Sequence, residues 1–372
     1  RQMHYFTFAE KDSTLYQASG SLNAGLDEIL EVRKDVSDTG DVVNVSRIVV
    51  QFDLTEVSKS VSNGTISAPT YFLNLYDAKP TALATTQSLY AYPVSQSWTM
   101  GDGRSYDNPI NQEGCSWFYK DGLTDGTLWG HDTMVSSSGG SWVTGSGYEG
   151  VLNFTHKSSD FRMDVTDIVN KWLDTSDALV NNGFMVKRTG GVGNLDSSLD
   201  EGSTDSLGNF SFFSSDTHTK YPPTLETVWY DSKWSTGSLS PLSSTNLEDM
   251  IVYMKGLRPE YKENSKVKFR VVGRERFPEA SFSTTPANLN VKYLPSGSSF
   301  YSISDAETND VIVGFSTSLI SCDSSGNYFN LDLNGYQPER YYTLEYRIQS
   351  GSGTVDETDQ YFDDSFTFKV KI

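Results

Sequence analysis

The sequence contains very little cysteine or histidine. Its two cysteines, Cys115 and Cys322, lie far apart among 372 residues, and only four histidines accompany them. Two distant cysteines cannot build the disulfide framework that stabilises small secreted domains. Cysteine and histidine are also the side chains that most structural metal sites use. We therefore expect a fold without disulfides and without a metal centre of this kind.

Basic residues and long apolar runs are also scarce. The chain has 29 Lys and Arg against 48 Asp and Glu, which gives a formal net charge of −19. Such a balance disfavours nucleic acid as a partner, because binding it requires cations that displace counterions from phosphates. No segment approaches the roughly 20 apolar residues that cross a bilayer, and the first residues lack the apolar core of a signal peptide. These absences predict an acidic, soluble protein that binds neither nucleic acid nor membrane.

Strand patterns dominate what the sequence does contain. The segments 48–52 and 71–76 are rich in β-branched and aromatic residues, and 266–271 and 342–348 alternate polar with apolar residues. Such alternation is typical of antiparallel sheets with one solvated face. One segment, 164–173, has apolar residues at helical spacing and an acidic residue that can cap its first turn. The predicted fold class is all-β, with this helix closing one end of a sandwich.

The length exceeds what one small core organises, and we predict three domains. These are a jelly-roll-like β-sandwich over 1–231, a small β-domain over 232–291 and a C-terminal β-domain over 292–372, the last two being Ig-like β-sandwich units. An internal repeat supports the two small units, because a Gly-x-x-Pro-Glu turn followed by a strand begins at Gly256 and again at Gly335. Chance similarity of a turn motif is the alternative.

The segment 97–147 has few strand patterns but carries four tryptophans, which are Trp98, Trp117, Trp129 and Trp142. Long loops inside a domain are usually functional or disordered, and exposing so many indoles is costly. We therefore expect an ordered excursion. Trp98 and Trp142 lie beside strand ends and are expected in the core. Trp117 and Trp129 are the candidates for stacking against the face of a sugar.

A second long loop, 189–209, consists almost entirely of Gly, Ser, Asp and Asn. Clustered carboxylates can hold Ca²⁺, which prefers oxygen ligands. The candidate ligands in this loop are Asp196, Asp200, Glu201 and Asp205. Their spacing matches no EF-hand loop, so a solvated acidic loop is the preferred interpretation and calcium the alternative.

Motifs of catalysis are absent from the sequence. It contains no phosphate-binding Gly-x-x-x-x-Gly-Lys-Ser/Thr loop, no His-Glu-x-x-His and no Gly-x-Ser-x-Gly. No pair of carboxylates stands out as the opposed acids that glycoside hydrolysis needs. The histidines are scattered and are expected to be surface or structural residues, at His4, His131, His156 and His218. We therefore predict neither catalytic nor metal-ligating residues.

The segment 255–276 is a basic island in this acidic chain. It holds eight Lys or Arg residues and only three Glu. One interpretation is the solvated face of a strand. The other is a docking surface for an acidic partner, since complementary potentials guide encounter and fix register. The candidate partner-binding residues are Arg258, Lys262, Lys266, Arg270, Arg274 and Arg276.

The first 231 residues resemble the DNRLRE-type β-sandwich domain, which is related to carbohydrate-binding modules of alginate-active enzymes and surface proteins. The resemblance implies a sandwich fold and, through the related modules, a possible glycan ligand. The enlarged segments 97–147 and 189–209 depart from the pattern. The residues that carry the resemblance are Gly25, Arg47–Leu54, Ile66–Ala68, Leu73–Tyr76, Val94 with Trp98, Asp164–Thr166 with Val169 and Trp172, Asn181–Phe184, Phe212–Ser215 and Tyr221–Leu225.

Residues from about 232 to 372 resemble the C-terminal parts of virion structural proteins from marine T4-like tailed phages, the cyanophages and their relatives. This resemblance implies a component of a virus particle, present in several copies beside other virion proteins. It leaves the position on the particle open. The matching stretches are Val291–Ser296, Tyr301–Ala306, Asp310–Val313, Leu319–Phe329 and Gly335–Tyr342.

Together these observations give two competing hypotheses. In the first, the chain is a non-enzymatic structural component of a tailed-phage virion, located in the capsid, neck, tail or baseplate as an accessory, connector or fibre protein. It would attach through its C-terminal β-domains. In the second, it is a carbohydrate-binding module or host-receptor-binding protein that recognises a host-surface glycan with its N-terminal sandwich. An enzyme of unrecognised type ranks third.

Overall fold

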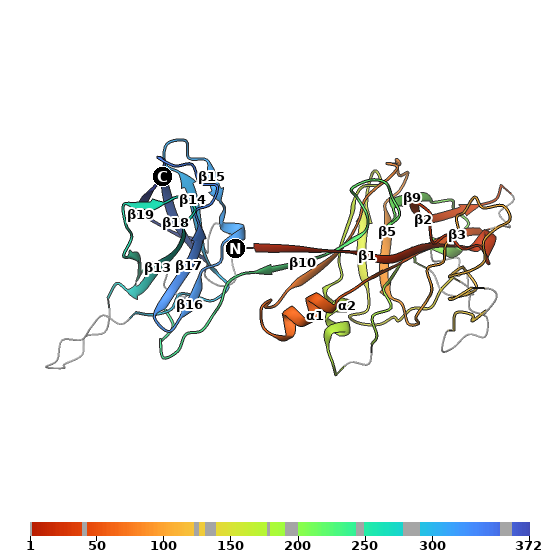
Figure 1. Ribbon diagram of the computed structural model, residues 1–372, viewed down its shortest axis with the longest axis horizontal. Helices are drawn as coiled ribbons and strands as arrows, with labels where there is room; N and C mark the ends of the chain where they lie inside the picture. The colour runs from red at the N-terminus through yellow and green to blue at the C-terminus, as the bar shows by residue number, and fades with distance from the viewer. Residues whose placement is uncertain are drawn as a thin grey trace. The chain divides into compact units, whose positions relative to one another are not determined.

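The chain folds as an all-β protein, as the sequence predicts (Figure 1). A computed structural model describes residues 2–38, 43–122, 126–130, 139–176, 179–189, 200–242, 249–277, 291–349 and 359–372. The chain divides into two compact units. We call His4–Val228 the N-terminal sandwich, and Trp229–Ile372, which is grouped with the first residues of the chain, the C-terminal sandwich.

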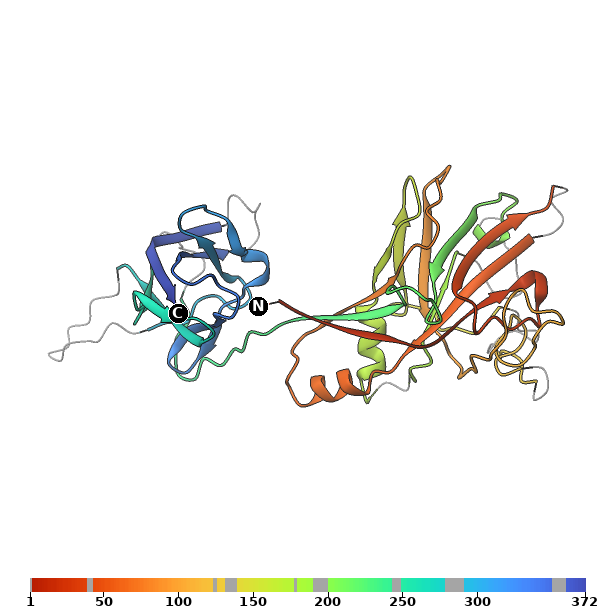
Figure 2. The ribbon, with the colours of Figure 1, turned by 45° about the horizontal axis from the view of Figure 1, so that its top comes forward.

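The N-terminal sandwich consists of antiparallel strands whose hydrogen bonding follows the order β6-β5-β8-β3-β1-β10-β4-β7, while β2 pairs with β3 and β9. Figure 2 shows the strands of this unit from a second direction. Two short helices lie among them. The strands are β1 (Gln2–Tyr16), β2 (Ile29–Val36), β3 (Val43–Phe52), β4 (Thr70–Leu75), β5 (Gln87–Pro93), β6 (Gly150–Phe154), β7 (Phe161–Asp164), β8 (Phe184–Lys187), β9 (Gly208–Phe213) and β10 (Thr224–Tyr230). The helical elements are η1 (Gln17–Ser19), α1 (Thr55–Ser62), α2 (Thr166–Leu173) and η2 (Asp200–Gly202).

The main core of this sandwich is built by residues that alternate along the strands. On β3, Ile48 and Val50 are buried in it. The helix predicted over 164–173 is confirmed as α2, whose Ile168 and Val169 are fully buried. Its Trp172 packs against Phe184 with ring centroids 4.7 Å apart. Alternation on the strands and helical spacing on α2 thus place apolar groups in one shared interior.

A second apolar cluster covers the other face of the same sheet. It takes the opposite set of β3 residues, Val45 and Val49, together with the four tryptophans of the 97–147 segment. Trp98 donates its indole N–H to the carbonyl of Asn182 at 2.8 Å, and Trp129 donates to Ser116 at 2.8 Å. Indoles that bury their rings and satisfy their N–H groups hold a loop firmly. The described part of this segment is therefore the ordered excursion that the sequence predicts.

The C-terminal sandwich consists of two facing sheets around one core. A four-stranded sheet has the order β11-β13-β17-β16, and a five-stranded sheet has the order β12-β19-β18-β14-β15. Both sheets contribute buried residues to a single cluster. The elements are β11 (Met250–Lys255), β12 (Glu260–Lys262), β13 (Lys266–Glu275), β14 (Ser299–Asp305), β15 (Val311–Val313), η4 (Phe315–Thr317), β16 (Ser321–Asp323), β17 (Gly326–Asp332), β18 (Tyr341–Gln349) and β19 (Asp359–Lys371).

The predicted division of this region into 232–291 and 292–372 is wrong, because strands from both halves pair with each other. β13 pairs antiparallel with β17, and β12 pairs parallel with β19. The repeated turns do exist, with Gly256 and Gly335 both at positive φ, +72° and +88°. Such angles favour glycine, so the repeat reflects shared turn geometry within one sandwich. The boundary between the two compact units falls at Val228 and Trp229, beside the predicted limit at 231.

A buried carboxyl in β1 makes the stability of the N-terminal sandwich dependent on pH. Asp12 is fully buried, accepts a hydrogen bond from the Ser215 N–H at 2.7 Å, and has its pKa raised to about 7 by burial. Because the folded pKa exceeds the unfolded value, this carboxyl contributes fully below about pH 4, and the contribution is lost as the pH rises towards 7. Asp12→Asn removes this loss. Between pH 4 and 8, the free energy of unfolding of Asp12→Asn should rise relative to that of the parent by up to about 4 kcal/mol, as measured by urea titrations.

The control is Asp53→Asn, since hydrogen bonds from Thr55 lower the pKa of this exposed carboxyl and reverse the sign of the pH dependence. Parallel stability curves for Asp12→Asn and the parent would show that Asp12 ionises normally in the folded protein.

Candidate functional sites

A buried ion cluster lies between the sheet and the tryptophan layer of the N-terminal sandwich. Arg47 on β3 donates to both carboxylate oxygens of Glu201, at 3.0 and 2.6 Å. The ammonium of Lys187 on β8 lies 3.3 Å from the same carboxylate. All three side chains are at most 2% exposed. Arg47 also lies 4.7 Å from the ring centroid of Trp117 and 4.9 Å from that of Trp142, so the aromatic faces help to hold the cation.

The assignment of Trp117 and Trp129 to sugar binding is therefore corrected. Trp117 is 5% exposed and stacks on Arg47, and Trp129 is 1% exposed. A sugar platform must present a ring face to solvent, and neither ring does so. The sequence suggested otherwise because it gives no sign that a cation from β3 lies beneath Trp117.

The calcium alternative also fails for Glu201, whose carboxylate is already neutralised by Arg47 and Lys187. Asp205 is exposed, and its backbone carbonyl accepts a hydrogen bond from the Lys34 ammonium at 2.9 Å. Asp200 begins η2, and Asp196 lies outside the described residues. Across the parts of the chain that the structure describes, no group of three or more His, Cys, Asp or Glu could hold a metal ion.

The histidines and cysteines lie in structural settings wherever they are described. His4 contacts Glu226, with 2.7 Å between Nδ1 and Oε1, and His218 lies 3.5 Å from Glu28 at the surface. The carbonyl of His156 accepts a hydrogen bond from Leu83, and His131 lies outside the described residues. Both cysteines are free and buried.

The helices among the described residues are all too short or too polar to span a membrane.

A basic face forms on the outer side of the four-stranded sheet in the C-terminal sandwich. On β13, Phe269 and Val271 point into the core, so the alternate residues lie on the opposite face. Register adds Lys255 on β11, directly opposite Arg270. The cations of this basic face are Lys255, Lys266, Lys268, Arg270 and Arg274, against the carboxylates Asp323 and Asp332.

Part of this basic face is braced by one carboxylate and one ring. Asp323 accepts hydrogen bonds from Lys268 at 2.8 Å and from Arg270 at 2.5 and 2.8 Å. These cations hold the pKa of Asp323 well below its usual range. The Lys268 ammonium also lies 3.7 Å from the ring centroid of Tyr328. Lys266 is held less closely, because it is 85% exposed and its ammonium lies 3.9 Å from the Asp332 carboxylate.

The structure brings together three of the six predicted partner-binding residues. Lys266, Arg270 and Arg274 share the outer face of β13. Arg258 lies in the turn before β12, and Lys262 lies on β12 in the other sheet. Arg276 is exposed just beyond the end of β13. The prediction missed Lys255 and Lys268 as members of the face, although period-two alternation along β13 would have selected Lys268.

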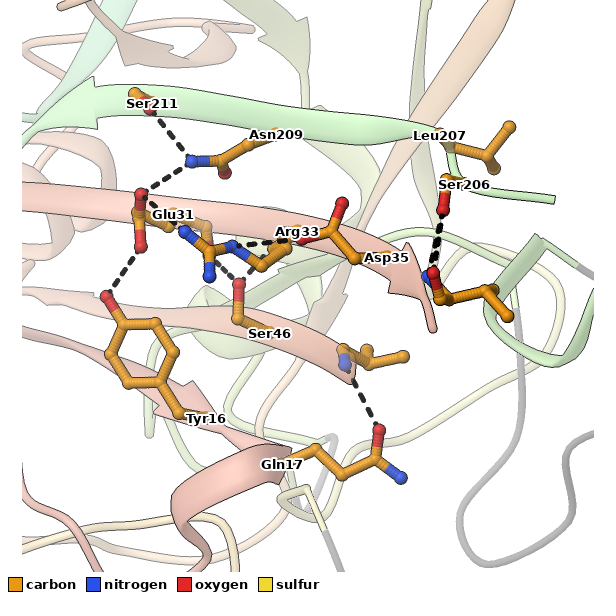
Figure 3. A network of polar contacts seen from close by, with 12 residues as sticks. Tyr16, Gln17, Glu31, Arg33, Asp35, Ser46, Ser206, Leu207, Asn209 and Ser211 are labelled. Carbon is orange, nitrogen blue, oxygen red and sulfur yellow. Dashed lines mark hydrogen bonds and ion pairs between the residues drawn. The ribbon is translucent and has the colours of Figure 1, made fainter. Parts of the chain in front are cut away.

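A pocket of about 620 Å³ lies on the outer side of β2 and β9 in the N-terminal sandwich, and we call it the β2–β9 pocket. Glu31 lies in its lining and is held on two sides (Figure 3). Its Oε2 accepts from the Tyr16 hydroxyl at 2.9 Å, and its Oε1 accepts from Asn209 at 2.5 Å. Burial and the neighbouring Glu31 raise the pKa of Tyr16, which keeps this hydroxyl a donor. Ser211, opposite Glu31 in register, also lines the pocket.

One wall of the β2–β9 pocket is a loop fixed by the buried side chain of Asn23. The Asn23 amide donates to the carbonyls of Met100 at 2.7 Å and Cys115 at 2.8 Å. Its oxygen accepts from the N–H groups of Gly25 at 3.2 Å and Gly103 at 2.8 Å. All four hydrogen-bonding positions of one amide are thereby used, so three separate segments are joined at one point.

The close approach of backbone to Asn23 requires glycine. Gly101 has φ +81°, and a Cβ there would lie 2.4 Å from the Asn23 side-chain oxygen. Beyond this point the loop is tied again, because the Ser105 N–H donates to Asp27 at 3.0 Å. The next residue, Tyr106, lines the pocket and is 76% exposed. Burial raises the pKa of Asp27, which is 7% exposed and also lines the pocket.

No protein-family model matches the chain, and no curated protein matches it. Similar solved structures include a DUF4785 family protein from Legionella pneumophila, with 8% identity and a TM-score of 0.20, covering 100% of this chain and 64% of that one. Salmonella alpha-2-macroglobulin reacted with methylamine matches with 11% identity and a TM-score of 0.22, covering 99% of this chain and 26% of that one. The chain thus spans less than two thirds of either protein. Matches this weak support no argument about function.

The ion cluster should dominate the stability of the N-terminal sandwich. Glu201→Gln removes the carboxylate that the two buried cations Arg47 and Lys187 share. Breaking a buried pair in this way costs about 3–5 kcal/mol. Asp205→Asn is the matched control, because its side chain is exposed in the same loop and should cost less than about 0.5 kcal/mol. Equal urea midpoints for the two variants would contradict the cluster's role.

Proposed function

We propose that the chain is a non-enzymatic structural component of a tailed-phage virion, attached to the particle by its C-terminal sandwich. The basic face on β11 and β13 would contact an acidic neighbour in the particle. The observation that carries the proposal is the gathering of five cations from two strands on one open sheet face, in a chain whose net charge is −19.

The charge distribution suits docking better than a merely solvated strand. The rest of this acidic chain repels an acidic neighbour, so the basic face selects one orientation of approach. Cations that Asp323 already braces, Lys268 and Arg270, lose little side-chain entropy on contact. Lys255 and Lys266 are exposed and supply the charge that attracts the partner.

Tyrosines lie among these cations. Tyr328 lies between Lys268 and Arg270, and Tyr253 on β11 is 38% exposed opposite Val272. Tyrosine and arginine are enriched in protein interfaces, where they combine contact area with polar ends. The face thus offers both the charge and the rings of a docking surface.

The assignment to a virion rests on the resemblance of residues 232–372 to phage structural proteins. The matching stretches include parts of the strands that face the core of the C-terminal sandwich, such as Tyr301 and Phe329. Particle components of this kind occur in several copies around symmetry axes, and we expect the same for this chain. Mass spectrometry of purified particles tests the assignment directly, because a chain missing from the virion cannot have this role.

Charge reversal tests the attachment. Lys255→Glu with Lys266→Glu places two negative charges on the basic face, and incorporation into particles should fall at least about tenfold. The matched control is Arg258→Glu with Lys262→Glu, which reverses two charges of the same segment away from that face. Particle copy number is measured by quantitative mass spectrometry. Attachment should weaken with salt, because exposed charges are screened beyond about 8 Å at physiological ionic strength.

Equal incorporation of both double variants would place the attachment elsewhere on the chain. A larger loss in the control would move it to the turn before β12.

A further inference from the structure

The first half of β1 is an edge strand. Within the part of the chain that the structure describes, β3 pairs with β1 only from Ala9 to Tyr16, and the sheet order places β10 on the other side of β1. Residues 4–8 therefore have a neighbouring strand on the β10 side only, and we call them the β1 edge. A strand edge of this kind presents backbone N–H and C=O groups with which another strand can pair.

The backbone groups of alternate residues point to the open side of the β1 edge. Ala9 donates its N–H to the carbonyl of Pro223, directly before β10, at 3.1 Å. Successive residues of a strand direct their N–H and C=O groups to opposite sides. The groups of His4, Phe6 and Phe8 therefore point away from β10, where each residue can both donate to and accept from an added strand.

The β1 edge lacks the features by which proteins usually keep strand edges apart. The stretch from Gln2 to Ala9 contains no Lys, Arg, Asp, Glu or Pro, and charged residues and proline are the common protection against edge-to-edge pairing. Its aromatic residues Tyr5, Phe6 and Phe8 are 44%, 45% and 61% exposed. Neighbouring exposed apolar side chains on an open edge indicate a contact with another strand.

The charge distribution favours a second copy of this chain as the partner. Each copy carries a net charge of −19, so two copies repel each other on average. They can approach where the surface is uncharged, as it is along the β1 edge. The nearby carboxylate of Glu226 is buried and accepts a hydrogen bond from Arg162 at 2.8 Å. A strongly charged partner would gain no attraction from this segment.

The β1 edge can also pair with itself. Antiparallel pairing of a strand with its own copy is two-fold symmetric, so the contact closes as a dimer. The free stretch runs from Gln2 to Phe8, because β3 occupies the edge from Ala9 onward, and its midpoint is Tyr5. In this register His4 lies opposite Phe6 of the partner copy, and the two Tyr5 side chains meet at the axis. Aromatic pairs across neighbouring strands stabilise sheets.

We propose that two copies of the chain associate by antiparallel pairing of their β1 edges, with Tyr5 at the two-fold axis. The paired stretch is short, so the contact belongs to the small, transient class of interfaces. It lies in the N-terminal sandwich, whereas the basic face belongs to the other compact unit. The dimer would form whether or not the chain is part of a virion.

Sedimentation equilibrium of the full chain tests the dimer. Between about 1 and 500 µM, the average mass should rise from that of one copy towards that of two. Added salt should strengthen the association, because it screens the repulsion between the acidic copies. Tyr5→Lys places two like charges opposite each other and should raise the Kd of the dimer at least about tenfold. The matched control is Val151→Lys on the edge strand β6, where the valine is 49% exposed, and it should leave the Kd unchanged.

A disulfide between copies tests the register. The Cα atoms of directly opposed residues without mutual hydrogen bonds lie about 4.5 Å apart, a separation that a disulfide can span. Tyr5→Cys should therefore give a covalent dimer when oxidised glutathione is added, and Val151→Cys should stay monomeric in denaturing electrophoresis. The native cysteines, Cys115 and Cys322, are buried and should not compete.

A chain that stays monomeric over the whole concentration range overturns the proposal, and so does a dimer that Tyr5→Lys leaves intact. At concentrations where both are monomeric, Tyr5→Lys and the parent should have the same melting temperature, because this side chain is largely exposed. Lys255→Glu with Lys266→Glu should dimerise normally. Salt weakens attachment through the basic face but strengthens this dimer, so failure of one proposal is distinguishable from failure of the other.

Discussion

The N-terminal sandwich depends on the burial of one guanidinium group. Arg47 occupies a position on β3 that faces away from the main core, between Val45 and Val49, which belong to the tryptophan cluster. A cation cannot be buried there without a counter-charge and hydrogen-bond acceptors. Glu201 and the carbonyl of Gly139, 2.6 Å away, supply them. These two partners come from two different long loops, so a single side chain determines where both loops lie.

This constraint explains why one sheet carries two apolar clusters. The strands β3 and β8 are buried on both faces, and all four residues of β8 are buried. In a sheet with one solvated face, the residues on the outer side are mostly polar. Here the outer side is covered by the 97–147 segment, whose Trp117 and Trp142 lie against Arg47. The loop that looks irregular in sequence acts as a further layer of the fold.

Features set by local periodicity could be predicted from the sequence, and features set by distant pairing could not. Alternation in 266–271 and helical spacing in 164–173 correspond to β13 and α2. The pairing of β12 with β19 joins residues that no local pattern connects. Because of this pairing, the two domains expected over 232–291 and 292–372 form one sandwich. The contact between Arg47 and Glu201 spans 154 positions, and Trp117, which lies against Arg47, was misjudged for the same reason. The pocket was missed because its lining comes from five separate segments.

The topology of the N-terminal sandwich also determines the order in which it can form. β1 lies beside β10 in the sheet, so the first and last strands of this unit are neighbours. Contacts between such distant segments carry a large loop-closure entropy, and folds rich in them form slowly. During synthesis, one edge of β1 stays unpaired until β10 has been made. Strands of other chains can pair with that edge in the meantime. The growing polypeptide therefore needs a protection against aggregation that this edge does not need in the finished sandwich.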